Sequence, residues 1–198
     1  MKFEWWFWDT NKELLNELFS LKNKYNYEQI KICEDIKSLE EKFNVVILAN
    51  LLHELNPINA SNVFVQVRNF VKDGIGKILI LEMYPLIHPE KLAVPYDRKD
   101  LENILLNIGW QISSDFWSIK GGGVQAYYIC GHSPDDHHST DYEKILSVIT
   151  NKWDEILSYN CSLYKGISEI ASAKEQVGLL SILTTIASIN NYKNGNWK

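Results

Sequence analysis

The chain of 198 residues is 45% hydrophobic and 23% charged, the composition of a soluble globular chain with one domain, or one domain and an appendage. Its net charge of −5 argues against a protein that holds nucleic acid by neutralising phosphates, and no apolar run is long enough for a membrane span or a signal peptide. The three cysteines, Cys33, Cys130 and Cys161, are widely spaced, so they indicate neither a disulfide framework nor a zinc site, and the reducing cytoplasm is the expected compartment.

The N-terminal segment predicts a strand, a helix and a second strand. The aromatic block at residues 3–8 suits a packed strand, and leucines at helical spacing predict a helix over 11–24 that covers one face of a sheet. Asp9 and Thr10, between these two elements, offer a helix N-cap. Residues 27–33 alternate well enough for a strand, and Asp35 and Ile36 follow it.

Two runs with apolar interiors predict buried parallel strands that deliver polar groups to one edge of a sheet. Residues 44–49 have no helical period and are followed by Asn50 and Leu51, then by His53 and Glu54. Residues 77–84 form the second run, which carries Glu82 near its end. A helix predicted over 60–72, with Pro57 in the connection before it, makes this unit a βαβ crossover.

The next segment predicts a loop, a helix and a hairpin. Prolines punctuate a long loop over 85–95, which we expect to cover a site. Asp97 or Asp100 caps a helix that ends at Gly109, and strands over 111–119 and 124–131 form an antiparallel hairpin around a glycine-rich turn at 120–123. A turn is the better interpretation of these glycines than a phosphate loop, because a strand follows them and not a helix.

After residue 133 the sequence predicts a polar linker and a helical hairpin. Thr140 and Glu143 form a capping box before one amphipathic helix, and a second helix runs from about 167 to 189. We therefore expect an α/β domain over 1–133 and an appended hairpin over 134–198 that suits packing or self-association. The linker residues Asp135, Asp136, His137 and His138 are metal-ligand types, but adjacent linker residues rarely converge on one ion, so no metal site is expected.

The order and spacing of these segments resemble class I S-adenosylmethionine-dependent methyltransferases. The resemblance spans residue 3 to about 132 and is carried by the segments FEWWFWD, ICEDI, FNVVILANLLHEL, VKDGIGKILILEMYPL and DLENILLNIGW. It implies a Rossmann-like, mostly parallel sheet with a terminal antiparallel hairpin, and S-adenosylmethionine bound at the carboxyl ends of the strands.

The resemblance also implies roles for individual residues. Asp9, followed by Thr10, resembles the acid after the family's second strand, which accepts hydrogen bonds from the ribose hydroxyls of the cofactor. Asp35 and Ile36 resemble the pair after the third strand that contacts adenine. Each acid has a simpler alternative, because Asp9 also suits a helix cap and Asp35 a turn.

The resemblance implies that the end of the family's fourth strand faces the methionine moiety of the cofactor and the methyl acceptor. Asn50 and Leu51 occupy this place, and His53 or Glu54 is the candidate general base that removes a proton from the acceptor. The alternative for His53 and Glu54 is a hydrogen-bonded structural pair, and for Glu82 it is a salt bridge.

One departure from the family bears on the whole prediction. The family's first strand and its glycine-rich GxGxG turn should lie before Phe3, and no GxGxG occurs in this chain. That strand is central in the family's sheet, so two edges stay unpaired unless an upstream segment or a partner chain supplies it, or the sheet closes over the gap and cofactor binding is lost. We therefore expect a methyltransferase module for a small-molecule or protein acceptor, or else an inactive subunit that binds proteins.

Overall fold

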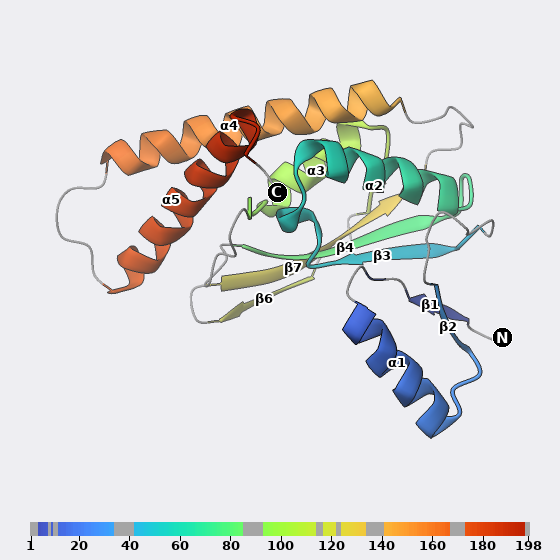
Figure 1. Ribbon diagram of the computed structural model, residues 1–198. Coiled ribbons are helices and arrows are strands. Elements are labelled where there is room, and N and C mark those ends of the chain that lie inside the picture. The colour runs from blue at the N-terminus through green and yellow to red at the C-terminus, as the bar shows by residue number, and fades with distance from the viewer. Residues whose placement is uncertain are drawn as a thin grey trace. The chain divides into compact units, whose positions relative to one another are not determined.

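The computed structural model describes residues 4–7, 9, 12–33, 42–84, 93–113, 117–121, 124–133, 141–166 and 173–196. The chain divides into two compact units, Met1–Glu41 and Lys42–Lys198 (Figure 1). The predicted division at residue 134 does not coincide with this boundary.

The first unit contains β1 (Trp5–Phe7), α1 (Lys12–Tyr25) and β2 (Ile30–Ile32). The two strands are parallel, and the bond from Cys33 N to Phe7 O, 2.8 Å long, ties their carboxyl ends together. The predicted helix is confirmed. The second strand is shorter than predicted, because residues 27–29 form a turn in which Ile30 N donates to Tyr27 O.

The second unit is built on a five-stranded sheet. Its strands are β3 (Val45–Ala49), β4 (Lys77–Tyr84), β5 (Gln111–Ile112), β6 (Trp117–Gly121) and β7 (Val124–His132). The order is β3-β4-β7-β5, with β6 also paired to β7. β3 and β4 are parallel, whereas β7 is antiparallel to β4, β5 and β6, so β7 alone runs against the others. The fold is therefore the predicted α/β class, with a mostly parallel sheet and an antiparallel β6–β7 hairpin.

The prediction of one continuous strand over 111–119 is wrong. Ile112 pairs with Gly131, but Trp117 pairs with Tyr128. Four residues of the chain lie between Ile112 and Trp117, but only two residues of β7 lie between their partners Gly131 and Tyr128. Such a mismatch interrupts a ladder of paired residues as a bulge does. The segment is divided into β5 and β6 for this reason.

Helices of the second unit begin at side-chain caps that the sequence only partly revealed. The η2 turn (Leu52–Glu54) precedes α2 (Pro57–Phe70). Asn56 caps α2 by accepting from Asn59 N at 2.9 Å, so the prediction that Pro57 lies in the connection is wrong. Proline suits the first helical position because its missing N–H would have no partner there. Asp97 and Asp100 together form a capping box at α3 (Arg98–Asn107).

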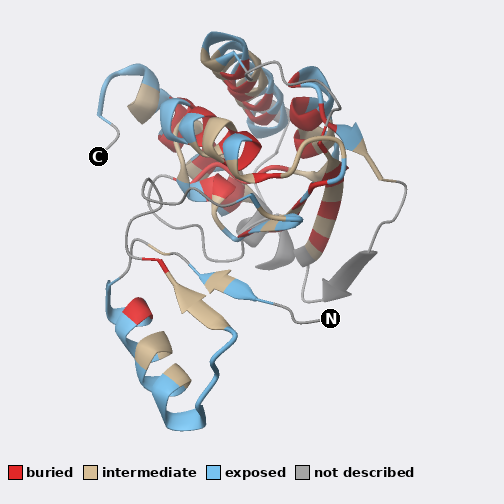
Figure 2. Cartoon of the chain, turned by 90° about the vertical axis from the view of Figure 1, so that its right-hand side faces the viewer, coloured by how far each residue is buried: buried red, intermediate tan, exposed pale blue. Residues whose placement is uncertain are grey.

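The core lies between the sheet and the helices that cover one of its faces, α2, α3 and α4 (Tyr142–Gly166), as Figure 1 shows. Residues coloured as buried in Figure 2 gather on these helices and on the sheet. The core includes Ile78, Ile80, Phe64, Leu101, Ile104, Ile145, Ile149 and Trp153. α5 (Ala173–Lys193) packs against α4, where Tyr192 meets Trp153 edge to face at 5.2 Å. The predicted helical hairpin is confirmed, and α4 contributes to the core of the sheet.

Candidate functional site

The chain turns sharply where β3 ends, at Asn50. This residue has φ of 50°, a left-handed conformation that asparagine tolerates better than most residues, and its N–H donates to Leu81 O. β3 and β4 are parallel and Ala49 pairs with Leu81, so the polar residues that follow β3 lie beside the carboxyl end of β4. Open α/β sheets bind their ligands at this end.

A buried carboxylate joins the ends of these two strands. Glu82, on β4, is only 2% exposed, and its Oε1 accepts from Leu51 N at 3.1 Å and Leu52 N at 2.8 Å. Its Oε2 lies 2.7 Å from His53 Nδ1. Because the carboxylate already accepts two amide hydrogens, His53 Nδ1 is best assigned as the third donor. Glu82 therefore fixes the turn after β3 and orients the imidazole.

The two candidate bases differ in their access to solvent. The His53 side chain is 5% exposed and that of Glu54 is 47% exposed, and His53 Nε2 lies 3.7 Å from Glu54 Oε1. His53 O also accepts from Val94 N, which attaches the segment before α3 to this turn. The predicted pair is thus brought together, with Glu82 as a third member.

Aromatic hydrogen bonds lie close to Glu82 on the covered face of the sheet. Tyr127 Oη donates to Tyr96 O and Trp153 Nε1 donates to Tyr96 Oη, both at 2.6 Å. Burial, and then the charge of Glu82, raises the pKa of the Tyr127 hydroxyl far above its usual value. Burial likewise raises the pKa of Tyr96, against the effect of the Trp153 hydrogen bond. Both phenols therefore stay protonated at neutral pH.

Sequence reasoning missed this aromatic group. Tyr96 follows the proline-punctuated segment and Trp153 belongs to α4, so nothing along the chain links them. A buried tyrosine or tryptophan needs a partner for its polar atom, which was the one available signal.

The predicted cofactor residues fall in both units. Asp9 follows β1 and is half-buried, while Thr10, Asp35 and Ile36 lie outside the described residues. Asn50 and Leu51 follow β3 in the second unit. The bond from Cys33 N to Phe7 O places the residues after β1 and β2 at the same edge of their two-stranded sheet.

Metal, disulfide and membrane features are absent from the described part of the chain. Its His, Cys, Asp and Glu side chains form no group of three that could hold a metal, and the predicted linker residues 135–138 lie outside it. No disulfide joins Cys33, Cys130 or Cys161. Among the described helices, none has both the length and the apolar character that crossing a bilayer requires.

Comparisons with known proteins identify the fold. No protein-family model and no curated relative matches the sequence. Among solved structures, the chain is similar to magnesium protoporphyrin IX methyltransferase from Synechocystis PCC 6803 with bound S-adenosylmethionine (TM-score 0.50, 14% identity), with 65% of this chain matched. The match spans 58% of the Synechocystis protein, so this chain corresponds to less than two thirds of it.

Two further solved structures are also similar to this chain. An O-methyltransferase family protein from Burkholderia thailandensis has a TM-score of 0.51 and 16% identity, over 67% of this chain and 44% of that one. The PH0226 protein from Pyrococcus horikoshii OT3 has a TM-score of 0.52 and 14% identity, over 66% and 72% of the two chains. The chain therefore has the fold of the class I S-adenosylmethionine-dependent methyltransferases.

Proposed function

We propose that this chain is a methyltransferase module that binds S-adenosylmethionine and transfers its methyl group to a small-molecule or protein acceptor. The observation that carries the proposal is the likeness to solved methyltransferases, one of them with the cofactor bound. The polar turn after β3, beside the carboxyl end of β4, supports it because this is where such sheets bind ligands.

The side chains present fit the cofactor chemically. Asp9 lies two residues after the end of β1, and a carboxylate accepts two ribose hydroxyls at once. Asp35 and Ile36 would hold adenine, the acid at the exocyclic amine and the aliphatic side chain at the ring. Asn50 and Leu51 would hold the methionine moiety. The bound cofactor supplies an electrophilic methyl group, and alignment of the acceptor with it supplies much of the rate.

Glu82, His53 and Glu54 would manage the proton of the acceptor. Glu82 fixes the imidazole through Nδ1, which leaves Nε2 directed toward Glu54. Glu54 is the exposed member, so we assign it the contact with the acceptor, while His53 shares the proton through Nε2. The pair of His53 and Glu82 then acts as an orienting unit, as a carboxylate does behind a catalytic histidine.

Full cofactor affinity requires a further strand in this proposal. Within the described residues β1 pairs only with β2, and β3 is an edge strand paired only with β4. Asn50 N and Asn44 O both bond to β4, so the alternating residues Val45, Ile47 and Ala49 direct their backbone groups to the other edge. A segment of the same protein, or a partner chain, would add its strand there.

The second candidate is a subunit without catalytic activity that binds proteins. The open β3 edge favours it, together with Val45 and Ile47, which are 48% and 46% exposed on the face opposite the helices. The C-terminal helices α4 and α5 would be the other surface for self-association. This candidate predicts no saturable binding of cofactor, even when a strand is supplied.

Calorimetric titration of the full chain with S-adenosylhomocysteine distinguishes the methyltransferase module from the subunit without catalytic activity. We expect saturable binding that Asp9→Ala weakens at least about tenfold, because hydrogen bonds to a charged group are lost. Glu17→Ala, an exposed acid on α1, is the matched control and should bind like the parent. The strand that completes the sheet is expected to raise the affinity and not to create it, so absence of binding even at millimolar ligand would contradict the proposal, as would equal affinity of the two variants.

A further inference from the structure

The outward face of α5 carries leucines at positions where a surface helix normally carries charge. Leu180 and Leu183 are 52% and 41% exposed, and the next exposed residues along the helix are Ala187 and Asn190. The sequence from 176 to 192 contains no Asp, Glu, Lys or Arg. A helix at the surface of a globular protein usually places charged and polar residues on the side away from the core. These four residues therefore form an uncharged stripe, which we call the outer seam.

The opposite face of α5 packs on the second unit and carries small polar side chains. Tyr192 meets Trp153 of α4 on this face, with ring centroids 5.2 Å apart. Ser181, Thr185 and Ser188 share the face at helical spacing and are 6%, 2% and 2% exposed. Small hydroxyls are thus buried while leucines face outward. Because exposed apolar patches mark interaction sites, we expect the outer seam to be covered in the assembled protein.

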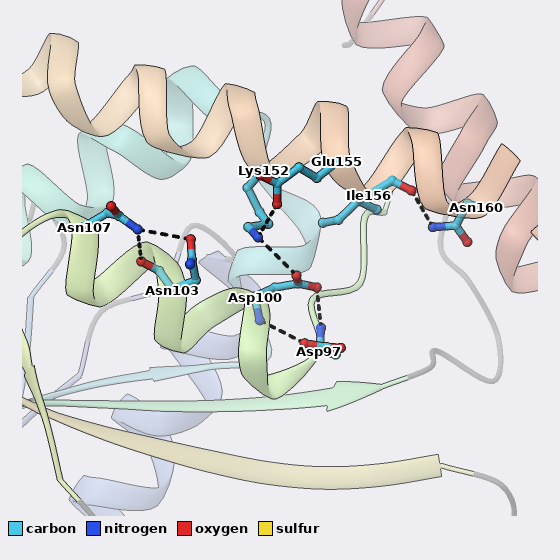
Figure 3. A network of polar contacts seen from close by, with 8 residues as sticks. All are labelled: Asp97, Asp100, Asn103, Asn107, Lys152, Glu155, Ile156 and Asn160. Atoms are coloured by element: carbon cyan, nitrogen blue, oxygen red, sulfur yellow. Dashed lines mark hydrogen bonds and ion pairs between the residues drawn. The ribbon is translucent and has the colours of Figure 1, made fainter. Parts of the chain in front are cut away.

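α4 differs from α5 in this respect and has an ordinary charged surface. The side chain of Glu155 is 67% exposed and pairs with Lys152, whose Nζ also lies 3.6 Å from Asp100 Oδ1 of α3 (Figure 3). Asp154 is 52% exposed and pairs with Lys193 at the end of α5. The uncharged surface is therefore a property of α5 and not of the whole hairpin.

Exposed apolar side chains near the end of α4 enlarge the surface available for contact. Tyr159 and Leu163 are 58% and 37% exposed, and they line one cavity together with Ile182, so they lie beside the middle of α5. The outer seam alone is about 15 Å long, which is short for a standard interface of about 800 Å² per partner. A face two helices wide, about 20 Å by 30 Å, approaches the size that a stable dimer requires.

The spacing and charge of the outer seam fit an identical helix. Its residues follow one another at intervals of three, four and three, the repeat by which helices pack side by side in coiled coils. A second copy brings an equally uncharged seam, so no charge is buried without a partner. In an antiparallel pair, Leu183 meets the partner's Ala187 on both sides of the axis, so a large side chain opposes a small one. A second copy of this chain therefore suits the outer seam better than a charged partner does.

We propose that two copies of this chain associate through their C-terminal hairpins, with the two α5 helices antiparallel across a twofold axis. The interface is isologous, because each outer seam packs on the same seam of the partner. The exposed apolar side chains of α4 extend its margin. The inference rests on the helices alone, and it holds whether or not the chain binds a cofactor.

Sedimentation velocity of the full chain, from about 1 to 200 μM, tests the association. The parent should shift from the 23.0 kDa monomer to twice that mass as its concentration rises. Leu183→Glu places like charges in the contact and should weaken dimerisation at least about tenfold. Leu106→Glu makes the same change at a 57% exposed residue of α3 and should dimerise like the parent. A parent that is monomeric at every concentration, or equal association of the two variants, would overturn the proposal.

A charge-exchange experiment tests the antiparallel arrangement. Ala187→Lys should also weaken the dimer, but its equimolar mixture with Leu183→Glu should recover affinity at least about threefold, because opposite charges then meet across the axis. An equimolar mixture of Leu183→Glu and Leu183→Lys should not recover it. Recovery in the second mixture, or in neither, would overturn the antiparallel pairing. Titration with S-adenosylhomocysteine reports on the cofactor separately, so a failure there leaves this result standing.

Discussion

At the scale of single residues, Glu82 is the most constrained polar group of the site. Three donors converge on its two oxygens, two of them backbone amides of the turn after β3. A side chain that holds a backbone turn and a histidine together contributes to stability and to function through the same contacts. A variant of Glu82 must therefore be measured for both its free energy of unfolding and its activity.

Glu82→Ala should be strongly destabilising. It leaves the amides of Leu51 and Leu52 and the imidazole of His53 buried without their acceptor, a loss of about 3 to 5 kcal/mol in the free energy of unfolding. Glu102→Ala removes an acid that pairs with Arg98 on the surface of α3 and should cost less than about 1 kcal/mol. Urea unfolding measures both, and similar losses would refute the role assigned to Glu82.

Asp100 gives a prediction in pH. Its pKa in the folded chain is raised by burial, so ionising it costs more in the folded than in the unfolded state. Its contribution to stability is complete below pH 3.8 and decreases as pH rises through the folded pKa. Asp100→Asn should therefore gain stability relative to the parent as pH rises from 3 to 7, measured by urea unfolding. The exposed Asp154→Asn is the control, and parallel profiles would refute the prediction.

At the scale of elements, close packing at the start of β4 explains a glycine. A Cβ on Gly76 would lie 2.0 Å from Val71 Cγ1 and 2.5 Å from Lys72 O, so a backbone atom blocks it. Gly109, by contrast, has φ of 94° with open space around it, and only its conformation opposes a side chain. Glycine is therefore required at Gly76 for a steric reason and is favoured at Gly109 for a conformational one.

Gly76→Ala should lower the free energy of unfolding by at least about 3 kcal/mol, because α2 and β4 must move apart. Gly109→Ala should cost about 1 to 2 kcal/mol from left-handed strain alone. Thermal and urea unfolding rank the two variants. The reverse order would show that the contact between Val71 and Gly76 is relaxed in solution.

The elements also show what a sequence can reveal. The apolar runs predicted the strands β3 and β4, and the leucine period predicted the helix α1, because such runs and periods are local patterns. The expected burial of β3 on both faces is wrong, since Val45 and Ile47 are exposed on the face away from the helices. The pairing of His53 with Glu82 depends on strand register, and the hydrogen bond from Trp153 to Tyr96 depends on how α4 packs over the sheet. Neither leaves a local pattern, and Pro57 was misplaced because proline marks both loops and first helical turns.

At the scale of the whole molecule, the two units differ in their means of stabilisation. Among the described residues of the first unit only Leu15 and Cys33 are buried hydrophobic side chains, and its sheet is two strands of three residues. Isolated two-stranded sheets are marginally stable. The second unit has an extensive core under α2, α3 and α4. In our proposal each unit supplies cofactor residues, Asp9 in the first unit and Asn50 in the second.

Hydrogen–deuterium exchange of the full chain, with and without saturating S-adenosylhomocysteine, tests that claim most directly. We predict slower exchange in peptides from both units, those that carry Asp9 after β1 and those that carry Asn50 and Leu51 after β3. Protection confined to one unit, or exchange that the ligand leaves unchanged, would contradict the cofactor roles that we propose for these strand ends.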